Sequence, residues 1–583
     1  MLQRTKIIVV SVVVILVVAG IAAYFLLSTS PPAQRTLTYY SQYEISTLDP
    51  ADAYDSGSFI PIQNSYDTLL SYPLTTISAF APALATEVPT VANGGISADG
   101  LTYTFHLRPN VKFSNGNPFT ADDVVYTFQR VLRINSPSSG VAWIDSQDLN
   151  TTSITKIDDH TVQFKLTHVF NPFLQTLATA EPNAIVDKET VEANGGITDG
   201  QDNPWMMNNT VGTGPYMVQS WTKAQQIVLV RNPNYWGNTS GARYDKVVML
   251  LNQLPSTAIS AARSGDATIA DIPFTQAASL ADATNVQLKV SPVPRTYMVG
   301  FDINSTHAFM ANASVRQALS WAFPYDTVIA NAFQGYATPL NGAVPTQIYL
   351  GTESMPTKFY SYNLTKAAAI LDAAGFTKNS NDLRFGGTAV SFYAISSIAW
   401  QPTVAQLYQA SLQQIGITLD IHSVPDAVRS ATQKTNGWDL MIETWGPDYN
   451  DPNDYALPFV GSAAIGGDTY HTVYANATID NALTDAMTTT DLAREIADYH
   501  TVWTVQNANP SLIYMCVAQA IAAVSKSLTN FTYNAIITYN FWFYLPSSSV
   551  GTSSLSVGAA VAPQSASEPF RTFLNVYQRL LHA

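Results

Sequence analysis

The residues best suited to chemistry lie in one short stretch that holds Glu443, Asp448 and Asp451. Two carboxyl groups at a suitable separation can work as general acid and general base, as in glycoside hydrolysis. A run of Asp residues directly after a strand is more commonly a turn, because Asp side chains hydrogen-bond to nearby backbone. We therefore predict a turn here rather than a catalytic pair.

Other catalytic and metal-binding patterns are missing from the sequence. The eight His residues form no His-Glu-x-x-His motif, and neither a Gly-x-Ser-x-Gly elbow nor a phosphate-binding loop with Lys occurs. Cys516 is the single Cys, so the chain can form neither an internal disulfide nor a cysteine metal cluster. In its apolar run we expect Cys516 to be buried and inert. These features predict a protein that is not an enzyme and uses no cofactor or metal.

Composition limits the class of protein further. The chain has 583 residues, which is beyond the usual size of a single hydrophobic core, so two or more lobes are expected. Charged residues are only 12%, and the net charge is −14. An acidic chain does not suit nucleic acid, since phosphates require a basic surface. A surface of uncharged polar groups suits an extracellular location. It would also suit an acidic environment, where carboxylates lose their charge.

An apolar N-terminal segment, Ile7 to Leu27, carries no charge. As a helix it would span roughly 30 Å, the thickness of a bilayer core. Arg4 and Lys6 precede it, and the next basic residue is Arg35. The positive-inside rule then predicts a single-pass anchor in the cell membrane, with the main body extracellular. A cleaved signal peptide is the alternative, although the segment is long for one.

Eight Asn-x-Ser/Thr sequons are compatible with glycosylation outside the cell. They lie at Asn150, Asn208, Asn238, Asn304, Asn312, Asn363, Asn476 and Asn530. A chain this rich in Asn, Ser and Thr contains about as many by chance, so they add little to the argument.

The predicted secondary structure that must position the acidic stretch differs between the two halves of the chain. The first half is rich in short antiparallel strands, with a first strand over 36–43, a helix over 61–70 and a helix over 120–130 that opens on a capping box. The second half alternates strand and helix. Its clearest unit has a strand over 390–395, a helix over 401–414 and a strand over 417–422, which predicts parallel pairing.

The C-terminal end of the sequence has two distinct parts. Residues 546–569 are rich in Ser, Ala, Gly and Pro, which is typical of a flexible linker. Residues 570–583 repeat apolar side chains at helical spacing. We expect a helix that docks on the body, with a partner-binding or membrane-surface helix as the alternative.

Five motifs, which follow one another along the chain, together resemble the motifs of a known protein family. They are "STLDPADAYDSGSF" around Asp49, "DGLTYTFHLRPNVKFSNGNPFTADDVVYTFQR" at 99–130, "VGTGPYMVQSW" with "VRNPNYWG" at 211–237, "VRQALSWAF" at 315–323 and "WGPDYNDPNDY" at 445–455. Together they resemble solute-binding protein family 5, the extracellular substrate-binding proteins of peptide and nickel ABC importers.

The resemblance implies an α/β fold of the periplasmic-binding-protein type, with two lobes that close over a ligand and an extra subdomain. The boundaries that we predict are a membrane segment at 1–30, lobe I at 31–70, 181–290 and 509–545, the extra subdomain at 71–180, lobe II at 291–508, and the linker with its helix at 546–583. The resemblance also implies ABC permease subunits as partners.

The resemblance further implies where a ligand would bind. Asp448 matches an Asp that pairs with the ligand's α-amino group in peptide-binding relatives, and an ammonium partner would offset the cost of burying a carboxylate. Trp445 matches a position that lines side-chain pockets, and Tyr449 follows Asp448 in the same motif. Main chain at Gly57, Ser58 and Phe59 looks like the loop that meets an extended peptide.

One departure from the family pattern leaves the ligand open. Peptide-binding relatives often carry another Trp about twenty residues before the position of Trp445, whereas this chain has Val424 to Ala427 there. We predict an oligopeptide ligand, with an oligosaccharide as the alternative, as in similar proteins of archaea and thermophiles, and a nickel chelate as a third. A surface sensor or adhesion role and a secreted hydrolase are alternatives from other classes.

Overall fold

The computed structural model describes residues 35–73, 76–240, 243–340, 342–355, 358–435, 437–465, 474–534, 536 and 539–546. The predicted membrane segment and the predicted linker and C-terminal helix lie outside these residues. Among the residues described, no helix combines the length and the apolar character needed to cross a bilayer.

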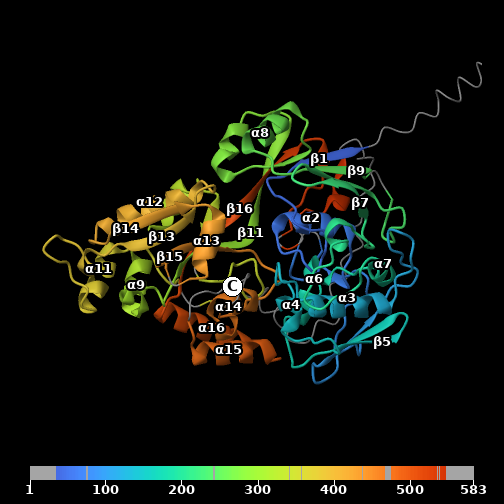
Figure 1. The fold of residues 1–583 in the computed structure, drawn as a ribbon, viewed down its shortest axis with the longest axis horizontal. Helices are drawn as coiled ribbons and strands as arrows, with labels where there is room; N and C mark the ends of the chain where they lie inside the picture. Colours follow the sequence, from blue (N-terminus) through green and yellow to red (C-terminus); the bar gives the residue numbers. More distant parts are fainter. Residues whose placement is uncertain are drawn as a thin grey trace, which may run out of the picture.

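One large mixed sheet organises the chain (Figure 1). Its order is β14-β13-β15-β11-β16-β10-β1-β9-β8-β7, with β12 paired to β16. The strands are β1 Thr36–Tyr40, β7 Tyr216–Thr222, β8 Gln226–Arg231, β9 Lys246–Leu250, β10 Ile269–Asp271, β11 Val286–Phe301, β12 Ala337–Pro339, β13 Val390–Ile395, β14 Leu419–Val424, β15 Leu440–Trp445 and β16 Leu512–Ser525. The fold is therefore mixed α/β, as predicted.

Helices cover both ends of this sheet. They are α2 Ser56–Ser65, α3 Ala121–Ile134, α4 Trp143–Ser146, α5 Phe173–Thr176, α6 Ala180–Asn183, α7 Lys188–Ala193, α8 Pro255–Ser264, α9 Ala313–Trp321, α10 Tyr325–Asn331, α11 Leu364–Ala373, α12 Trp400–Gln413, α13 Asp426–Gln433, α14 Asn453–Val460, α15 Ala477–Thr488 and α16 Leu492–Ala508. Smaller sheets join β2 Leu70–Ser71 to β3 Ala81–Pro82, β17 Leu528–Thr529 to β18 Leu545–Pro546, and β4 Thr102–His106 through β6 Thr161–Lys165 to β5 Ile154–Asp158.

Two long antiparallel strands, β11 and β16, connect the two ends of the sheet (Figure 1). The first half of β11 pairs with the end of β16 that also contacts β10. The second half of β11 pairs with β15 on its other side. The ladder is interrupted between these halves, because Pro292 pairs with Gln519 and the next pair is Thr296 with Val517. Three residues of β11 thus oppose one residue of β16.

The parallel unit predicted in the second half is confirmed. Strand β13 pairs in parallel with β14, and α12 connects them. The predicted helix after Asn363 is also confirmed as α11, where the Asn363 side chain accepts from the Lys366 amide. Gly375 follows with a φ of +85°, the left-handed geometry that ends a helix. The core between these elements is formed by buried residues of 298–518.

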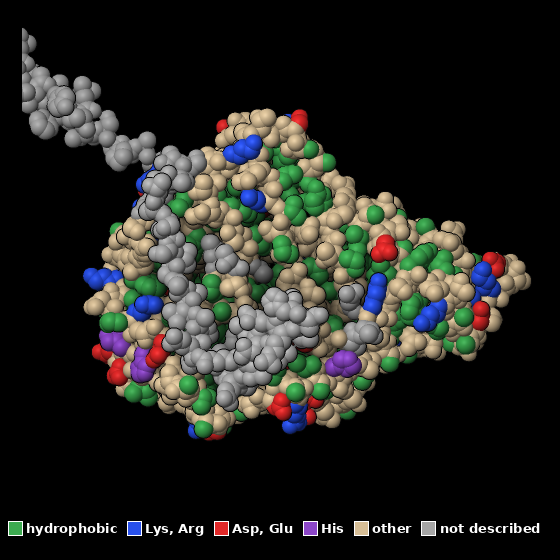
Figure 2. All heavy atoms as spheres, turned by 180° about the vertical axis from the view of Figure 1, so that it is seen from behind, with side chains coloured by type: hydrophobic (Ala, Val, Ile, Leu, Met, Phe, Trp, Pro, Cys, Tyr) green, Lys and Arg blue, Asp and Glu red, His purple; other side chains and the backbone are tan. Residues whose placement is uncertain are grey.

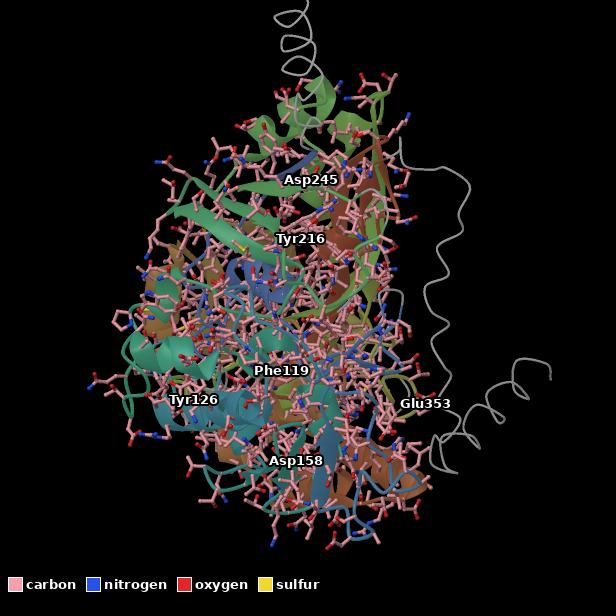
Figure 3. All side chains as sticks on the ribbon, turned by 90° about the vertical axis from the view of Figure 1, so that its right-hand side faces the viewer. Phe119, Tyr126, Asp158, Tyr216, Asp245 and Glu353 are labelled. Atoms are coloured by element: carbon pink, nitrogen blue, oxygen red, sulfur yellow. The ribbon has the colours of Figure 1, made fainter. Side chains whose placement is uncertain are left out.

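Two of the larger hydrophobic cores lie mainly in the first half of the chain. One lies between the small β4-β6-β5 sheet and α3 and includes Phe119. The other lies against β1, β8 and β9 and includes Tyr216. Figure 3 shows Tyr216 in the upper part of the molecule and Phe119 below it. Helix α3 begins as predicted, since Thr120 and Asp123 form both bonds of the capping box.

The helix predicted over 61–70 is wrong in its bounds. Helix α2 spans Ser56–Ser65, because Asp55 caps it and accepts hydrogen bonds from the Gly57 and Ser58 amides. Pro61 lies inside this helix rather than at its start. The chain then leaves the helix and forms β2.

One face of the molecule carries few charged side chains, in line with the composition. On the face drawn in Figure 2, uncharged polar and apolar side chains cover most of the described surface and charged groups are scattered.

Candidate ligand-binding site

Asp448 and Asp451 lie in the loop that leads from β15 to α14, whereas Glu443 lies within β15. Asp448 is 9% exposed. Its Oδ2 accepts a hydrogen bond of 2.6 Å from the Tyr54 hydroxyl. Nothing in the described part of the chain donates to Oδ1 or forms an ion pair with this carboxyl group. Burial raises the pKa of Asp448 to about 7, although the bond from Tyr54 acts in the opposite direction.

Two further contacts connect the Asp448 region to the first half of the chain. The Tyr54 oxygen accepts a hydrogen bond of 3.0 Å from Trp143 Nε1. The Thr179 hydroxyl donates to the Asp448 carbonyl at 2.8 Å. The segments that hold Tyr54, Trp143 and Thr179 therefore lie together around Asp448.

A second carboxyl group, that of Asp454, fixes the shape of the loop. Its Oδ2 accepts from the Asp448 amide at 3.0 Å and from Trp445 Nε1 at 3.3 Å. Burial and the neighbouring Asp448 raise the pKa of Asp454 well above its usual range. Asp451 accepts from the Tyr499 hydroxyl at 2.9 Å, and burial raises its pKa to about 6. The acidic run is thus a turn held by neutral donors, as predicted.

Trp445 and Tyr449 flank Asp448 but are themselves well packed. Trp445 is 8% exposed and meets Phe459 edge-on, with ring centroids 5.3 Å apart. Tyr449 is fully buried, and its hydroxyl accepts from Asn453 Nδ2 at 2.9 Å and from Gln147 Nε2 at 3.3 Å. Both rings contribute to the rigidity of the loop, and their contact with a ligand remains a prediction.

Gly57, Ser58 and Phe59 form the first turn of α2 rather than a loop. Ser58 Oγ accepts from the Ser46 and Thr47 amides and donates to Asp55. An added Cβ on Gly57 would lie 1.7 Å from the Glu44 carbonyl oxygen, so only glycine fits there. Phe59 is half-buried in a small core with Tyr66. These residues hold the chain between 44 and 47 against the start of the helix.

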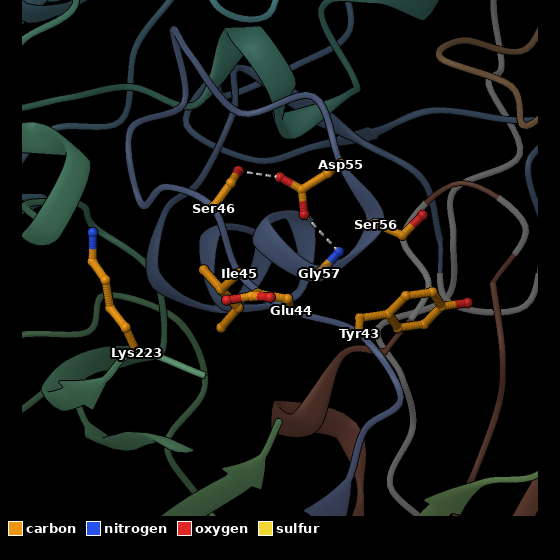
Figure 4. A pocket seen from close by; sticks show the side chains of 8 residues that line it. All are labelled: Tyr43, Glu44, Ile45, Ser46, Asp55, Ser56, Gly57 and Lys223. Carbon is orange, nitrogen blue, oxygen red and sulfur yellow. Dashed lines mark hydrogen bonds between the residues drawn. The ribbon is translucent and has the colours of Figure 1, made fainter. Parts of the chain in front are cut away.

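That arrangement forms the floor of a pocket of about 630 Å³ (Figure 4). Figure 4 shows the Tyr43 ring and the Ser56 side chain on one side of the pocket, and Lys223 on the other. The lining residues are Tyr43, Glu44, Ile45, Ser46, Asp55, Ser56, Gly57 and Lys223. The predicted segment 57–59 therefore contributes to a concave surface through Gly57.

Sequence reasoning missed Tyr54, which donates to the Asp448 carboxyl group, and Trp143, which donates to the Tyr54 oxygen. Tyr54 lies in the motif around Asp49, one residue before the cap of α2. The motif therefore includes this residue, but it does not indicate that the hydroxyl contacts Asp448. Sequence reasoning also missed Arg295, which lies where β11 is interrupted and donates to Ser56 Oγ at 3.2 Å. Pro292 and Pro294 around it were the available sign of an interrupted strand.

Potential metal ligands do not cluster among the residues that the structure describes. Within the described ranges, no three side chains of His, Cys, Asp or Glu gather closely enough to hold an ion. Cys516 is buried, and burial raises the pKa of its thiol, as expected for an inert side chain.

Comparison with known proteins gives consistent matches along the chain. The family model for bacterial extracellular solute-binding proteins, family 5, matches residues 79–467. The chain is 28% identical over 502 residues to a probable D,D-dipeptide-binding periplasmic protein of Escherichia coli, with 85% of this chain and 91% of that protein covered. It is 27% identical over 493 residues to a di/tripeptide-binding protein of Pseudomonas aeruginosa, covering 82% and 88%.

A solved structure shows the same fold. The periplasmic binding protein DppA of Helicobacter pylori, determined in complex with the peptide STSA, matches with a TM-score of 0.74 and 24% sequence identity. The match covers 88% of this chain and 99% of that one. Nearly the whole fold of that protein is therefore present in this chain.

Proposed function

This chain belongs to the family of bacterial extracellular solute-binding proteins, family 5, and from this premise we propose that it captures short peptides outside the cell and delivers them to an ABC importer. Members of this family bind solutes and are not enzymes. Two relatives described above are named for dipeptides or di- and tripeptides, which supports a peptide ligand. The oligosaccharide alternative has no such support from them.

The observation that carries the peptide proposal is the environment of Asp448. Its carboxyl group is buried, one oxygen accepts from Tyr54, and the described residues supply no cation to it. A carboxylate in such surroundings is stabilised by an ammonium group, whereas a neutral sugar would leave the charge unpaired. The α-amino group of a peptide is the partner that this site fits.

We propose that the two lobes and the extra subdomain follow the boundaries predicted from the sequence. The strands β11 and β16 then form the connection about which lobe II, 291–508, closes on lobe I. The hydrogen bonds from Tyr54 and Thr179 to Asp448 would be interlobe contacts of the closed state. Closure would exclude water from the Asp448 carboxylate and strengthen its pairing with the ligand.

We also propose that Ile7 to Leu27 tethers the protein to the cell membrane, with the body outside. A tethered binding protein stays near the permease subunits that receive its ligand. The tether is supported by the length of the apolar segment and by the basic residues that precede it.

Native mass spectrometry tests the proposed function directly. The body, residues 31–583, would be purified from its own host and analysed before and after denaturation. A mixture of intact short peptides released on denaturation is the expected result. A released sugar would contradict the peptide ligand, and a chemically converted ligand would contradict a binding role.

A further inference from the structure

The sequons of the chain all lie at the surface of the folded protein. Seven of their eight Asn side chains are exposed, and that of Asn476 is half-buried. The Asn side chains that are buried begin no sequon; they are Asn64, Asn183, Asn203, Asn232, Asn450, Asn453 and Asn534. Burial therefore excludes none of the eight sequons from modification, and their local geometry must distinguish between them.

Two sequons share a geometry in which the third residue contacts the Asn side chain. Asn150 lies in the loop between α4 and β5, and its Oδ1 accepts from the Thr152 amide at 2.9 Å and from the Thr152 hydroxyl at 2.7 Å. Asn238 lies in the loop between β8 and β9, and its Oδ1 accepts from the Ser240 amide at 2.9 Å and from the Ser240 hydroxyl at 2.6 Å. Neither Nδ2 donates to another group of the described chain, so both are free to react.

The hydroxyl contact favours a reaction at Nδ2. An amide nitrogen is a poor nucleophile, because its lone pair is delocalised onto the carbonyl oxygen. When Nδ2 loses a proton, negative charge develops on Oδ1. A hydroxyl that already donates to this oxygen stabilises the charge. The side chains of Asn150 and Asn238 are thus prepared for bond formation at nitrogen.

The other six sequons lack this contact within the described residues. Asn312, Asn363 and Asn476 use Oδ1 to cap helices α9, α11 and α15. Nδ2 of Asn208 donates to the Pro204 carbonyl at 3.0 Å. In these sequons the side-chain amide serves the fold, and the sequon hydroxyl does not donate to it.

We propose that Asn150 and Asn238 carry N-linked oligosaccharides. In the transfer, Nδ2 forms a bond to C1 of the first sugar, and the bond from C1 to the phosphate of a lipid-linked oligosaccharide breaks. The lipid phosphate leaves with the electron pair, and the Nδ2 proton passes to a base of the transferase. The product is an amide that still carries one N–H group.

The location and composition of the protein suit this modification. The family to which the chain belongs is extracellular, where glycans are added to exposed loops. Only 12% of the residues are charged, so hydroxyl-rich glycans would add to the hydration of the surface. Neither Asn150 nor Asn238 lines the pocket of Figure 4, so glycans at these positions are compatible with ligand binding there.

Glycopeptide mass spectrometry tests the inference on the unaltered protein. The full chain would be purified from its own host and digested, and the peptide of each sequon would be measured before and after chemical removal of glycans. We expect most molecules to carry a glycan at Asn150 and at Asn238, and fewer to carry one at the other six positions. A protein without glycans, or one with its highest occupancy at the helix-capping sequons, would overturn the inference.

Paired substitutions of the third residue test the role of the hydroxyl. Thr152→Ala keeps Asn150 and removes the donor, so the intact mass should fall by one glycan. Thr152→Ser keeps the hydroxyl and should keep the glycan. Ser240→Ala and Ser240→Thr form the same pair for Asn238, and thermal melting reports whether each variant folds. A glycan that persists at Asn150 in Thr152→Ala, or at Asn238 in Ser240→Ala, would contradict the proposed chemistry.

Discussion

The Tyr54 hydroxyl donates a hydrogen bond to the Asp448 carboxyl group at 2.6 Å, although 394 positions separate the two residues in the sequence. Asp448 follows β15, whereas Tyr54 precedes the cap of α2. The bond joins the two halves of the chain at the proposed ammonium site. It also leaves the second carboxylate oxygen for a ligand.

The Tyr54→Phe substitution tests whether this bond prepares the site. The ring stays, but Asp448 loses its donor, so its pKa rises further and less of it is ionised at pH 7. We expect peptide affinity at pH 7 to fall about tenfold. Tyr408→Phe is the matched control, because the buried Tyr408 hydroxyl donates to the Leu319 carbonyl and does not contact the Asp448 carboxylate. An equal loss in both variants would refute a specific role for Tyr54.

The Asp448→Asn substitution tests the charge pairing itself. It keeps the shape of the side chain and removes the negative charge. We expect the affinity for a tripeptide with a free amino group to fall at least about tenfold at pH 8, since hydrogen bonds between charged groups are the strong ones. The same peptide with an acetylated amino group should bind both proteins equally weakly. Isothermal calorimetry measures the four affinities. An equal loss of affinity for both ligands on substitution would contradict a pairing between Asp448 and the ammonium group.

Peptide affinity is also expected to depend on pH in a direction set by Asp448. Burial raises the pKa of its carboxyl group to about 7 in the absence of ligand. Below pH 7 the ligand ammonium must then displace a proton, so affinity should fall as pH drops from about 8 to about 5. The Asp448→Asn variant should show a flat profile over this range. A flat wild-type profile would mean that another group binds the ligand.

The sequence correctly predicts those elements of the fold whose position depends on neighbouring residues. The β13-α12-β14 unit follows from strand and helix periodicity, and α11 follows from Asn363 as its cap. The sequence pattern predicts a start for α2 at Pro61, which is five residues too late. The side chain of Asp55 in fact caps the amides of Gly57 and Ser58, which starts the helix earlier.

Only the part of the candidate site that lies in one consecutive motif could be predicted from the sequence, and the reason is physical. Asp448 lies in a motif whose residues are consecutive, so the sequence shows it directly. Its donor Tyr54 and the cation Arg295 reach the site through the strand order of the large sheet and through a break in the β11–β16 ladder. Long-range pairing of this kind leaves no trace in local periodicity.

Gly57→Ala tests the close approach that shapes the pocket floor. A methyl group at this position would lie 1.7 Å from the Glu44 carbonyl oxygen, so the backbone must move. We expect a loss of about 1–3 kcal/mol in the free energy of unfolding, the usual range for overpacking. Gly437→Ala is the control, since a methyl group there meets nothing nearer than 3.4 Å. Equal unfolding midpoints in denaturant for both variants would contradict the steric argument.

Two buried carboxyl groups predict that the protein is more stable in acid than at neutral pH. Asp145 and Asp148 are each 1% exposed, and no described cation pairs with them. Burial raises the pKa of Asp145 to about 7, and burial with the neighbouring Asp145 raises that of Asp148 well above its usual range. In the unfolded chain both would titrate near pH 4. The folded state therefore binds more protons above pH 4.

Stability should consequently fall as pH rises from about 4 to about 7, by on the order of a few kcal/mol. Asp148→Asn removes one ionisable group without removing its volume and should flatten the profile. Glu353→Gln, at an exposed position, should leave it unchanged. Denaturant unfolding at pH 4, 5.5 and 7 measures the three profiles. A wild-type free energy of unfolding that rises over this range would contradict the destabilising effect of the two buried carboxyl groups.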